Sequence, residues 1–391
     1  MQGNPTSRPL RILYGFAYFP TRSADPKQLF LAHVRRLQEA GFDVEPFCLT
    51  LDPPAQAMTF RELDWRWRLK DKILLTLYEN LAFKLSDYDV LLNGNGINLH
   101  PAFIEQLSVF TVFQCFDDPE NSHNLSKPVV HAYDLCLVGN VAEVDNYRRW
   151  GAQAAEWTTL SLEPGFYGET LTYDEVLHGQ RDIDLFMMID RLAPWNGRRQ
   201  RLDKLAAAFP MAHFYGQGWD KGFLPVEEQL RLMRRAKIGP NVHNSTGPLN
   251  SRTFYTPANG MMQICDNKSH LGKLFELGTE AVGFDNIEEG VELCRYYLTH
   301  DEERQQIAAN GWRRAVTDYN EINVFKRRVE LIESQMRRSN KGLRRLNLPV
   351  STARQDPLVR VATTAARLTA CIDTAMRDPQ GTFYRMQQRL G

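Results

Sequence analysis

Short apolar runs alternate with helix-length amphipathic segments along most of this chain, and this alternation limits the fold more than any other feature. Residues 11–19 (RILYGFAYF) form a run of buried-strand type, and residues 26–41 carry apolar side chains at helical spacing and end on a glycine. In the first half, further strand candidates are residues 42–49, 88–96, 109–117 and 133–140, and a further helix candidate is 69–86. This β–α order predicts an α/β fold in which helices cover both faces of a parallel sheet.

The alternation weakens near residues 150–180, and within that segment residues 160–180 carry Gly and Pro without a clear period. A strand candidate at 183–189 restarts it, and because 391 residues are too many for one ordinary core, we predict two doubly wound domains. The predicted boundaries are 1–165 for the first domain, 166–180 for a connection, 181–335 for the second domain and 336–391 for a helical C-terminal extension. Two such domains predict a ligand-binding cleft at the carboxyl ends of their strands.

The C-terminal extension differs from the rest of the chain in its charge. From Lys341 onward it has nine Lys or Arg, three Asp and no Glu, whereas the whole chain balances 47 basic against 47 acidic residues. Residues 356–378 predict an amphipathic helix. One interpretation is a helix that docks on the protein body, and the other is a basic surface that contacts a membrane or an anionic partner. The neutral total disfavours general nucleic-acid binding.

Cysteine usage and the N-terminus bear on the compartment. None of the six cysteines lies in a metal-ligand spacing and most lie in apolar runs, which favours free thiols in a reducing compartment. The N-terminal stretch MQGNPTSRPLRILYG has no apolar signal-peptide core, and no window holds about 18 uninterrupted apolar residues. We therefore expect a cytoplasmic protein, with contact at the inner face of the membrane as the alternative that the basic extension suggests.

Several motifs that would identify an enzyme class are missing. The chain has no GxxxxGK[ST], no HExxH and no GxSxG. Gly94 and Gly96 resemble a glycine-rich turn, but the third glycine of a dinucleotide-binding motif is missing. A dinucleotide-binding dehydrogenase is therefore not supported, and we predict neither a metal site nor a cofactor.

The stretch NVHNSTGPLNSRTFY combines a strand end, a polar loop and a helix start. Asn241 and His243 lie at the predicted strand end, and Asn250 or Ser251 is expected to cap the helix. Free N–H groups at a helix start favour an anion, and the guanidinium of Arg252 in the first turn suits a phosphate. Because a cation in that turn opposes the helix dipole, it indicates a nearby anion. The alternative is a surface arginine that pairs with a carboxylate.

Two other segments of the second half place polar or aromatic residues near strand ends. Tyr215 and Gly216, in FYGQGW, predict a surface that cradles a base or a sugar ring, and the alternative is a set of core aromatics closing a turn. In IDRLAPWNGRRQRL, Arg191 follows a strand and Arg198 and Arg199 begin a helix. These positions fit phosphate contact, and the alternative is a solvated helix face.

The first half offers acidic and imidazole groups at corresponding positions. Asp117 and Asp118 end a strand, where they could bind sugar hydroxyls, act as a base or hold a metal. An adjacent Asp pair is a weak metal signal, and an Asp-Pro turn explains Asp118 equally well. His100 also follows a strand, and a lone histidine is more often structural than catalytic.

Several stretches share their order of residue types with a known family. They are DIDLFMMID, RRQRLDKL, FYGQGW, NSRTFYTPANGMMQICDNKSHLGKLFELGTEAVGFD and VELCRYYLTHDEERQQIAANGWRRAVTDY in the second half, with FQCFDDP and YDLCLVGN in the first. Together they resemble the CgeB-like spore-maturation glycosyltransferases, a branch of the GT-B class related to glycosyltransferase family 4. The resemblance spans residues 85–330 and is strongest between Arg252 and Tyr319.

This resemblance implies two Rossmann-like domains, with a nucleotide-sugar donor held mainly by the second, an acceptor facing the first, and no metal needed for catalysis. Carried over by position, Arg252 and the loop before it would meet the donor diphosphate. Arg191 and Arg199 would stand beside the phosphates, and Tyr215 and Gly216 would approach the nucleotide base.

The chain departs from the pattern of these relatives at two positions. Tyr255 stands where relatives commonly have a glutamate that holds the ribose hydroxyls, and Gly247 stands where family 4 has a second glutamate. A tyrosine cannot accept two hydroxyls as a carboxylate can. The surrounding frame, including Arg252 and Gly260, is kept.

We therefore predict a hexosyltransferase-type glycosyltransferase that moves a sugar from a nucleotide diphosphate to a hydroxyl of a polysaccharide, lipid-linked glycan or protein. The leaving group would be stabilised by Arg252 with Arg191 or Arg199, and Asp117 and His100 would face the reacting sugar. The kinship with family 4 implies retention of the anomeric configuration. The alternatives are a GT-B-shaped binding protein without turnover, and a phage-type enzyme that glycosylates modified DNA bases.

Overall fold

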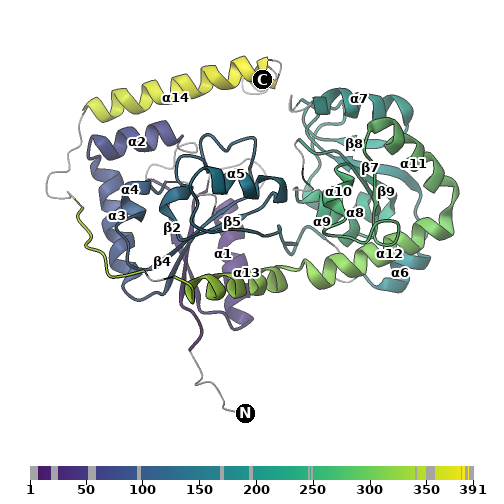
Figure 1. Ribbon diagram of the computed structural model, residues 1–391. Helices are drawn as coiled ribbons and strands as arrows, with labels where there is room; N and C mark the ends of the chain where they lie inside the picture. Colours follow the sequence, from purple (N-terminus) through teal and green to yellow (C-terminus); the bar gives the residue numbers. More distant parts are fainter. Residues whose placement is uncertain are drawn as a thin grey trace, which may run out of the picture. The chain divides into compact units, whose positions relative to one another are not determined.

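Two parallel β-sheets, each in its own unit of the chain, organise this computed structural model (Figure 1). The structure describes residues 8–18, 25–51, 59–94, 98–167, 171–192, 197–244, 247, 250–339, 341–348, 357–379, 381–383 and 386. The first unit comprises residues 1–139, 143–158 and 325–371, and the second comprises 140–142, 159–324 and 372–391. The α/β class predicted from the alternating pattern is confirmed, and each unit is described separately below.

The first sheet has the strand order β2-β1-β3-β4-β5-β6, and all its paired strands are parallel. Its strands are β1 (Ile12–Phe16), β2 (Val44–Cys48), β3 (Val90–Gly94), β4 (Phe110–Cys115), β5 (Leu135–Val138) and β6 (Ala155–Trp157). Ile12 pairs with Val44 on one side and with Val90 on the other. The inner strands are buried almost throughout because helices cover both faces, which explains their continuous apolar runs.

The helices of the first unit begin at recognisable caps. They include α1 (Pro26–Glu39), α2 (Phe60–Arg68), α3 (Lys72–Leu85), α4 (Pro101–Ile104) and α5 (Val144–Arg149). The side chains of Asp25, Thr59 and Asp71 accept backbone N–H groups at the starts of α1, α2 and α3. A core of leucines and aromatics, with Tyr78 and Phe103 stacked at 4.1 Å between ring centroids, fills the space between helices and sheet.

The second sheet repeats this plan with the order β11-β10-β9-β7-β8, again with parallel pairs. Its strands are β7 (Ile183–Met188), β8 (His213–Tyr215), β9 (Ala236–Asn241), β10 (Met262–Cys265) and β11 (Val282–Gly283). Its helices are α6 (Tyr173–His178), α7 (Arg198–Ala208), α8 (Val226–Arg235), α9 (Arg252–Ala258), α10 (Lys268–Leu271), α11 (Ile287–Thr299) and α12 (Asp301–Asp318). Helix α6 lies in the segment expected to be a plain connection, and Thr172 and Glu175 form a capping box at its start.

The C-terminal part of the chain differs from its predicted boundaries. Helix α13 (Glu321–Met336) enters the first unit at Phe325, whose ring stacks on Tyr14 with 6.3 Å between centroids. The following segment stays there, because Lys341 forms a buried ion pair of 2.6 Å with Asp134. The sequence shows that the C-terminal segment is basic and predicts that part of it is helical, but it does not tell which unit the segment packs on.

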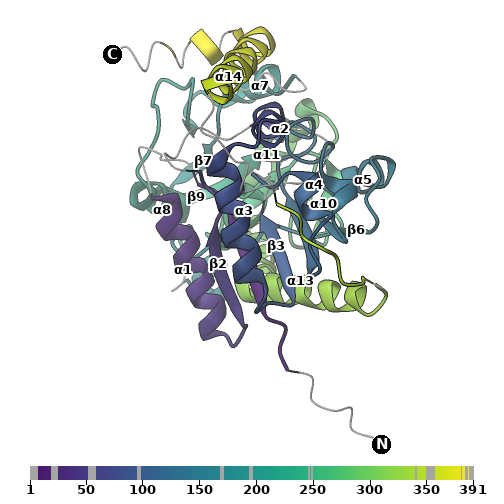
Figure 2. The ribbon, with the colours of Figure 1, turned by 90° about the vertical axis from the view of Figure 1, so that its left-hand side faces the viewer.

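The predicted amphipathic helix is present as α14 (Pro357–Arg377), and both ribbon views show it lying over α2 (Figures 1 and 2). Its Arg367 donates two hydrogen bonds of 3.0 and 2.8 Å to the buried carboxylate of Glu62 on α2. The part of this helix up to Cys371 therefore docks on the first unit, whereas its residues from Ile372 on belong to the second. Within the part of the chain that the structure describes, no helix combines the length and the apolar character that crossing a membrane requires.

Candidate functional site

Polar side chains gather at the carboxyl ends of β7 and β9, the two neighbouring strands of the second sheet whose following connections run in opposite directions. Strands β7 and β9 are neighbours, and the connection from β7 leads outward to β8 while that from β9 leads to β10 on the other side. In such open sheets, ligands bind at the carboxyl ends of the strands beside this switch point. Asp190, His243 and Asp266 lie just beyond the ends of β7, β9 and β10.

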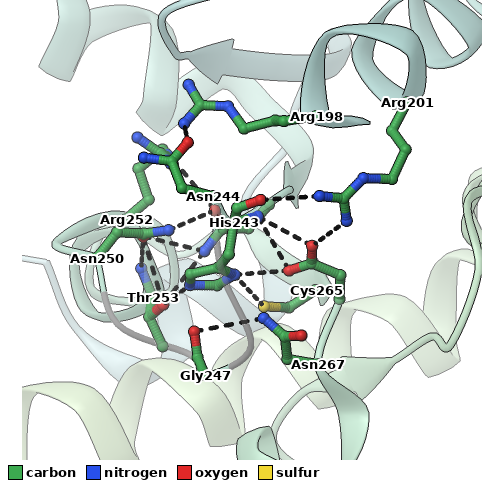
Figure 3. Close-up of polar contacts among 12 residues, drawn as sticks. Arg198, Arg201, His243, Asn244, Gly247, Asn250, Arg252, Thr253, Cys265 and Asn267 are labelled. Atoms are coloured by element: carbon green, nitrogen blue, oxygen red, sulfur yellow. Dashed lines mark hydrogen bonds and ion pairs between the residues drawn. The ribbon is translucent and has the colours of Figure 1, made fainter. Parts of the chain in front are cut away.

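Arg198, the first residue of α7, connects the two strand ends (Figure 3). Its guanidinium donates to the backbone oxygen of Asp190 after β7 and to the side-chain oxygen of Asn244 after β9. The side chain is only 4 % exposed, and its Nε has no hydrogen-bond partner among the described residues. Burial, followed by the nearby charge of Arg252, lowers the pKa of Arg198 to about 10. Arg198 is therefore a buried cation whose hydrogen bonds go to a backbone oxygen and an amide oxygen.

Arg252, the first residue of α9, is positioned from the same strand end. Its Nε donates to Oδ1 of Asn241 over 3.1 Å, and Asn241 and Asn250 exchange hydrogen bonds of 3.2 and 3.1 Å (Figure 3). Asn250 also accepts the backbone N–H of Thr253 at 3.1 Å, so it supplies the cap predicted for either Asn250 or Ser251. The hydrogen bond from Nε to Asn241 fixes the orientation of the Arg252 guanidinium.

A buried histidine and carboxylate hold the loop after β9. Nδ1 of His243 lies 2.6 Å from Oδ1 of Asp266, and the carboxylate also accepts the backbone N–H of His243. Arg201 completes the set, because it pairs with Asp266 at 2.8 Å and donates to the backbone oxygen of His243 at 3.0 Å. Nε2 of His243 lies 3.2 Å from Oγ1 of Thr253, which ties this set to the start of α9. These contacts tie the end of β9 to the start of α9.

The same residues form a group of potential metal ligands. Donor atoms of His243, Cys265 and Asp266 lie within 4.8 Å of one another, with Cys265 Sγ 3.8 Å from His243 Nδ1. However, Arg201 already pairs with Asp266, and burial raises the pKa of the Cys265 thiol well above its usual range. A thiol must lose its proton to bind a metal, so these contacts fit a hydrogen-bonded positioning network better than a metal site.

Three arginines thus lie at the carboxyl end of the second sheet, and they differ in whether a carboxylate balances their charge. Arg201 has its carboxylate partner in Asp266. Neither Arg198 nor Arg252 forms an ion pair with a carboxylate among the residues that the structure describes. Two adjacent guanidinium groups repel each other, and leaving buried charge uncompensated is costly. The geometry therefore suits a polyanion such as a diphosphate.

The other predicted residues of the second unit lie nearby but have different contacts. Arg191 pairs with Asp203 at 2.7 Å and stacks over the Trp219 ring at 4.9 Å, and Arg199 is half-buried on α7. Gly216 has φ 119°, and a Cβ there would lie 2.4 Å from the backbone oxygen of Ile189. Glycine is therefore required at this turn.

Tyr255 packs inside an apolar cluster instead of lying free on the helix surface. It is half-buried against a group that contains Phe186, Met233 and Tyr215. Burial raises the pKa of its hydroxyl, although the neighbouring Arg252 acts in the opposite direction. The ring of Tyr255 thus serves packing, while its hydroxyl stays close to the arginine at the site.

In the first unit, the two adjacent aspartates after β4 have different surroundings. Asp118 is buried and accepts hydrogen bonds from Ser126 and Tyr147, each 2.5 Å long. Asp117 remains exposed, yet the surrounding protein removes enough water from its carboxyl to raise its pKa. Burial raises the pKa of Asp118 as well, so it is exposure that gives Asp117 the properties of an acid or base, whereas Asp118 acts in the core.

His100, the other residue predicted for the acceptor side, is enclosed. Its ring stacks between Phe60 and Trp67, with centroids 6.0 and 5.0 Å away. Nδ1 accepts the backbone N–H of Ala102 and so caps α4, while Nε2 lies 3.4 Å from a carboxylate oxygen of Asp64. Both ring nitrogens are thus engaged, which favours a structural role.

With this geometry described, the comparisons with known proteins become informative. Residues 198–329, from the first residue of α7 into α13, match the family model described as glycosyl transferase-like. No curated protein matches the chain. Among solved structures, HepE (Alr3699) of Anabaena in complex with UDP and glucose has a TM-score of 0.56 at 14% identity, covering 83% of this chain and 100% of its own.

Two further structures have the same architecture. Sucrose-phosphate synthase of Thermosynechococcus elongatus has a TM-score of 0.55 at 13% identity, with 84% of this chain and 100% of that chain covered. The UDP-forming α,α-trehalose-phosphate synthase of Burkholderia vietnamiensis has a TM-score of 0.53 at 13% identity, with coverage of 83% and 100%. The fold is GT-B. At these identities the likeness establishes the GT-B architecture, and the family match falls on the GT-B unit that carries the arginine site.

Proposed function

We propose that this protein is a glycosyltransferase whose second unit binds a nucleoside-diphosphate sugar. The observation that carries the proposal is the pair of arginines, Arg198 and Arg252, which lie at the switch point without carboxylate partners among the described residues. The glycosyl transferase-like match over residues 198–329 supports the same conclusion, and so do the GT-B neighbours solved with UDP or UDP-glucose.

In the proposed reaction, an acceptor hydroxyl forms a new bond to the anomeric carbon of the donor sugar. The bond from that carbon to the diphosphate oxygen breaks, and its electron pair goes to the diphosphate. Arg198 and Arg252 stabilise this developing charge, a role that preorganised donors fill well in a water-poor site. The acceptor proton passes to the leaving phosphate or to Asp117, whose carboxyl is reachable and has a raised pKa.

The finer assignments rest on the resemblance to CgeB-like and family 4 enzymes. We infer from it transfer of a hexose with retention, independence of an added metal, and an acceptor that is a polysaccharide, a lipid-linked glycan or a protein. Arg191, Arg199, Tyr215 and Gly216 keep their proposed places around the phosphates and the base.

One observation favours binding without turnover as a second candidate. Neither ribose-holding carboxylate of the relatives is available, because Tyr255 packs in an apolar cluster and position 247 is glycine. Gly247 has φ 147°, which other residues rarely adopt, and a Cβ there would lie 2.1 Å from Oδ1 of Asn140, so a side chain at this position would be strained and would displace Asn140. A binding protein would retain the arginines and lack transfer.

A two-stage experiment separates these candidates. A thermal-shift screen with nucleoside diphosphates and their sugars identifies the donor, because a bound donor raises the unfolding temperature. Release of the free diphosphate is then measured with that donor, with acceptor mixtures and with a metal chelator. Release supports the enzyme, whereas tight binding with no release for any acceptor supports the binding protein. Absence of any nucleotide-dependent shift contradicts both, and salt-sensitive binding of duplex DNA would favour the DNA-modifying alternative.

A further inference from the structure

A series of hydrogen bonds connects the buried carboxylate of Asp266 with Arg252, and its members come from three different elements (Figure 3). Asn241 ends β9 and His243 follows it, while Asp266 lies just beyond β10. Thr253 lies in the first turn of α9. These four residues, which we call the relay, are each at most 4% exposed. Their polar atoms therefore depend on one another as partners, because buried polar groups lack solvent to bind.

The carboxylate decides which atom donates at each step of the relay. An ionised carboxylate only accepts hydrogen bonds, so Nδ1 of His243, 2.6 Å from Oδ1 of Asp266, carries a proton. In the neutral ring Nε2 is then the acceptor, and its partner is the hydroxyl of Thr253 at 3.2 Å. Oγ1 of Thr253 in turn accepts from Nδ2 of Asn241 at 3.2 Å. The donors therefore all point one way, from the amide of Asn241 toward Asp266.

This direction sets which way round the Asn241 amide lies. Its Nδ2 donates to Thr253 and to Oδ1 of Asn250, at 3.2 Å each. Its Oδ1 therefore faces the other way and accepts from Nε of Arg252 at 3.1 Å. The reversed amide would place its NH2 group against the Nε–H of Arg252, donor against donor. The hydrogen bond that orients Arg252 thus requires the amide orientation that Thr253 and Asn250 favour.

We propose that Thr253 and His243 are positioning residues for Arg252. They orient its guanidinium through Asn241 before a diphosphate binds, without a contact of their own to that ligand. The identity of the ligand rests on the proposed function, whereas the relay is a property of the unliganded protein. A guanidinium that is already oriented loses less freedom on binding, so loosening the relay should weaken diphosphate binding while the charge stays in place.

The test removes the hydroxyl of Thr253 and measures binding of inorganic pyrophosphate, which presents the diphosphate without base or sugar. Thr253→Val keeps the branched shape and should weaken binding about three- to tenfold in calorimetry, the size of one hydrogen bond. Thr253→Ser keeps the hydroxyl and should bind as wild type does. Thr256→Val is the matched control, because Thr256 is buried in the same helix with its methyl against Gly239, away from the relay. It should also bind as wild type does.

A double-mutant cycle distinguishes positioning of Arg252 from a general loosening of the fold. If the relay acts through Arg252, Thr253→Val should cause no further loss of affinity once Arg252 is replaced by alanine. An equal loss in both backgrounds would overturn the proposal. So would wild-type affinity in Thr253→Val, failure of the serine variant to retain binding, or a loss of the same size in Thr256→Val.

A measurement without any ligand keeps this test separate from that of the proposed function. In protein with 15N-labelled arginine, the Nε–H signal of Arg252 is identified by its disappearance in Arg252→Ala. Its exchange with water should be slow in wild type and in Thr253→Ser, and several-fold faster in Thr253→Val, because the hydrogen bond to Asn241 protects it. Unchanged exchange in the valine variant would overturn the proposal. Faster exchange there, in a protein that binds neither pyrophosphate nor nucleotide, would support the relay and contradict the proposed function.

Discussion

The carboxyl ends of the two sheets carry opposite chemistry although their strand orders follow one plan. In each sheet the first strand has the second on one side and the third on the other. Beyond the second sheet lie Arg198, Arg201 and Arg252, whereas the strand β4 of the first sheet leads into Asp117 and Asp118. The shared scaffold therefore supplies equivalent positions, and the side chains at the strand ends decide the chemistry.

The ionisable groups at each of the two edges differ in what holds them. In the second unit, Asp266 fixes Arg201, while Arg198 and Arg252 have no carboxylate partner among the described residues. In the first unit, the pKa of both aspartates is raised by burial, but Asp118 is fixed by two short hydrogen bonds while Asp117 is exposed. A functional site needs both kinds of group, because the reactive ones must be held in place by others.

The largest effect is expected from Arg252→Ala. The proposed diphosphate loses one of its two unpaired cations, so the rate of donor turnover should fall by about 10²–10³-fold. Affinity for the nucleoside diphosphate should fall as well, measured by calorimetry with the donor identified in the thermal-shift screen.

Arg191→Ala is the informative control for that variant. Arg191 already pairs with Asp203 and stacks on Trp219, so its removal should affect nucleotide affinity much less. If both variants lose affinity equally, the distinction between paired and unpaired arginines is wrong. An unchanged Kd in Arg252→Ala would contradict the phosphate assignment itself.

The next effect concerns the two aspartates. Asp117→Asn removes the proposed base and should slow turnover by about 10²-fold with little change in nucleotide affinity. Because the folded pKa of Asp117 is raised, the ionised carboxyl costs stability, and this cost develops as pH rises above the unfolded value of 3.8 through the folded pKa. The variant should therefore be at least as stable as wild type at neutral pH, measured by urea unfolding.

Asp118→Ala should show the opposite pattern. It removes the carboxylate that accepts from Ser126 and Tyr147, and although Tyr147 keeps its 3.0 Å hydrogen bond to Ser126, the Ser126 hydroxyl loses its acceptor, which costs about 1–3 kcal/mol of unfolding free energy. If Asp117→Asn is destabilised as strongly as Asp118→Ala and turns over as fast as wild type, the division between a functional and a structural aspartate fails.

A smaller effect is expected at His100. The sequence predicts a catalytic group there, but the contacts of the ring favour a structural role. Asparagine also caps helices well, so His100→Asn should keep the start of α4 and change the turnover rate only by a few-fold. Burial lowers the pKa of His100 below its ordinary value of 6.5, so protonation in acid favours unfolding. Wild-type stability should fall as pH drops from 6.5 toward the folded pKa, and the variant should lose this slope. If turnover in the variant instead slows by about 10²-fold or more, as expected when a general base is lost, the catalytic prediction is restored.

The sequence predicts the order of strands and helices well and the side-chain partners less well. Local pattern is enough to recognise strand ends and helix starts. It therefore singles out four residues that the structure brings together: Asn241, His243, Asn250 and Arg252. The distinction between Arg198 and Arg199 was not predictable, because one residue turns a helical side chain by about 100°. Which one points inward depends on the start of α7, which Gly197 sets with a φ of 64°.

Ion pairs between residues far apart in the sequence also cannot be predicted from local pattern. Asp266 meets Arg201 from a strand end 65 residues further along the chain, and no motif connects the two. The same holds for the C-terminal segment, whose Lys341 finds Asp134 in the first unit. The assignments of Arg191, Arg199, Tyr215 and Gly216 to the donor come from family resemblance and remain predictions.

The smallest effect is expected at Tyr255, and it decides how this site differs from that of its relatives. Tyr255→Phe keeps the ring in its apolar cluster and removes only the hydroxyl beside Arg252, so nucleotide affinity should change by about threefold or less, the size of a single neutral hydrogen bond. Tyr255→Glu instead introduces a carboxylate that can pair with Arg252, so it should withdraw that cation from the phosphate and lower affinity more than the phenylalanine does. If the glutamate variant binds its nucleotide more tightly, the pocket has kept the geometry of the ribose-holding relatives, and the tyrosine has replaced a functional carboxylate. If both variants bind as wild type does, Tyr255 contributes packing alone, and donor selection depends on other residues.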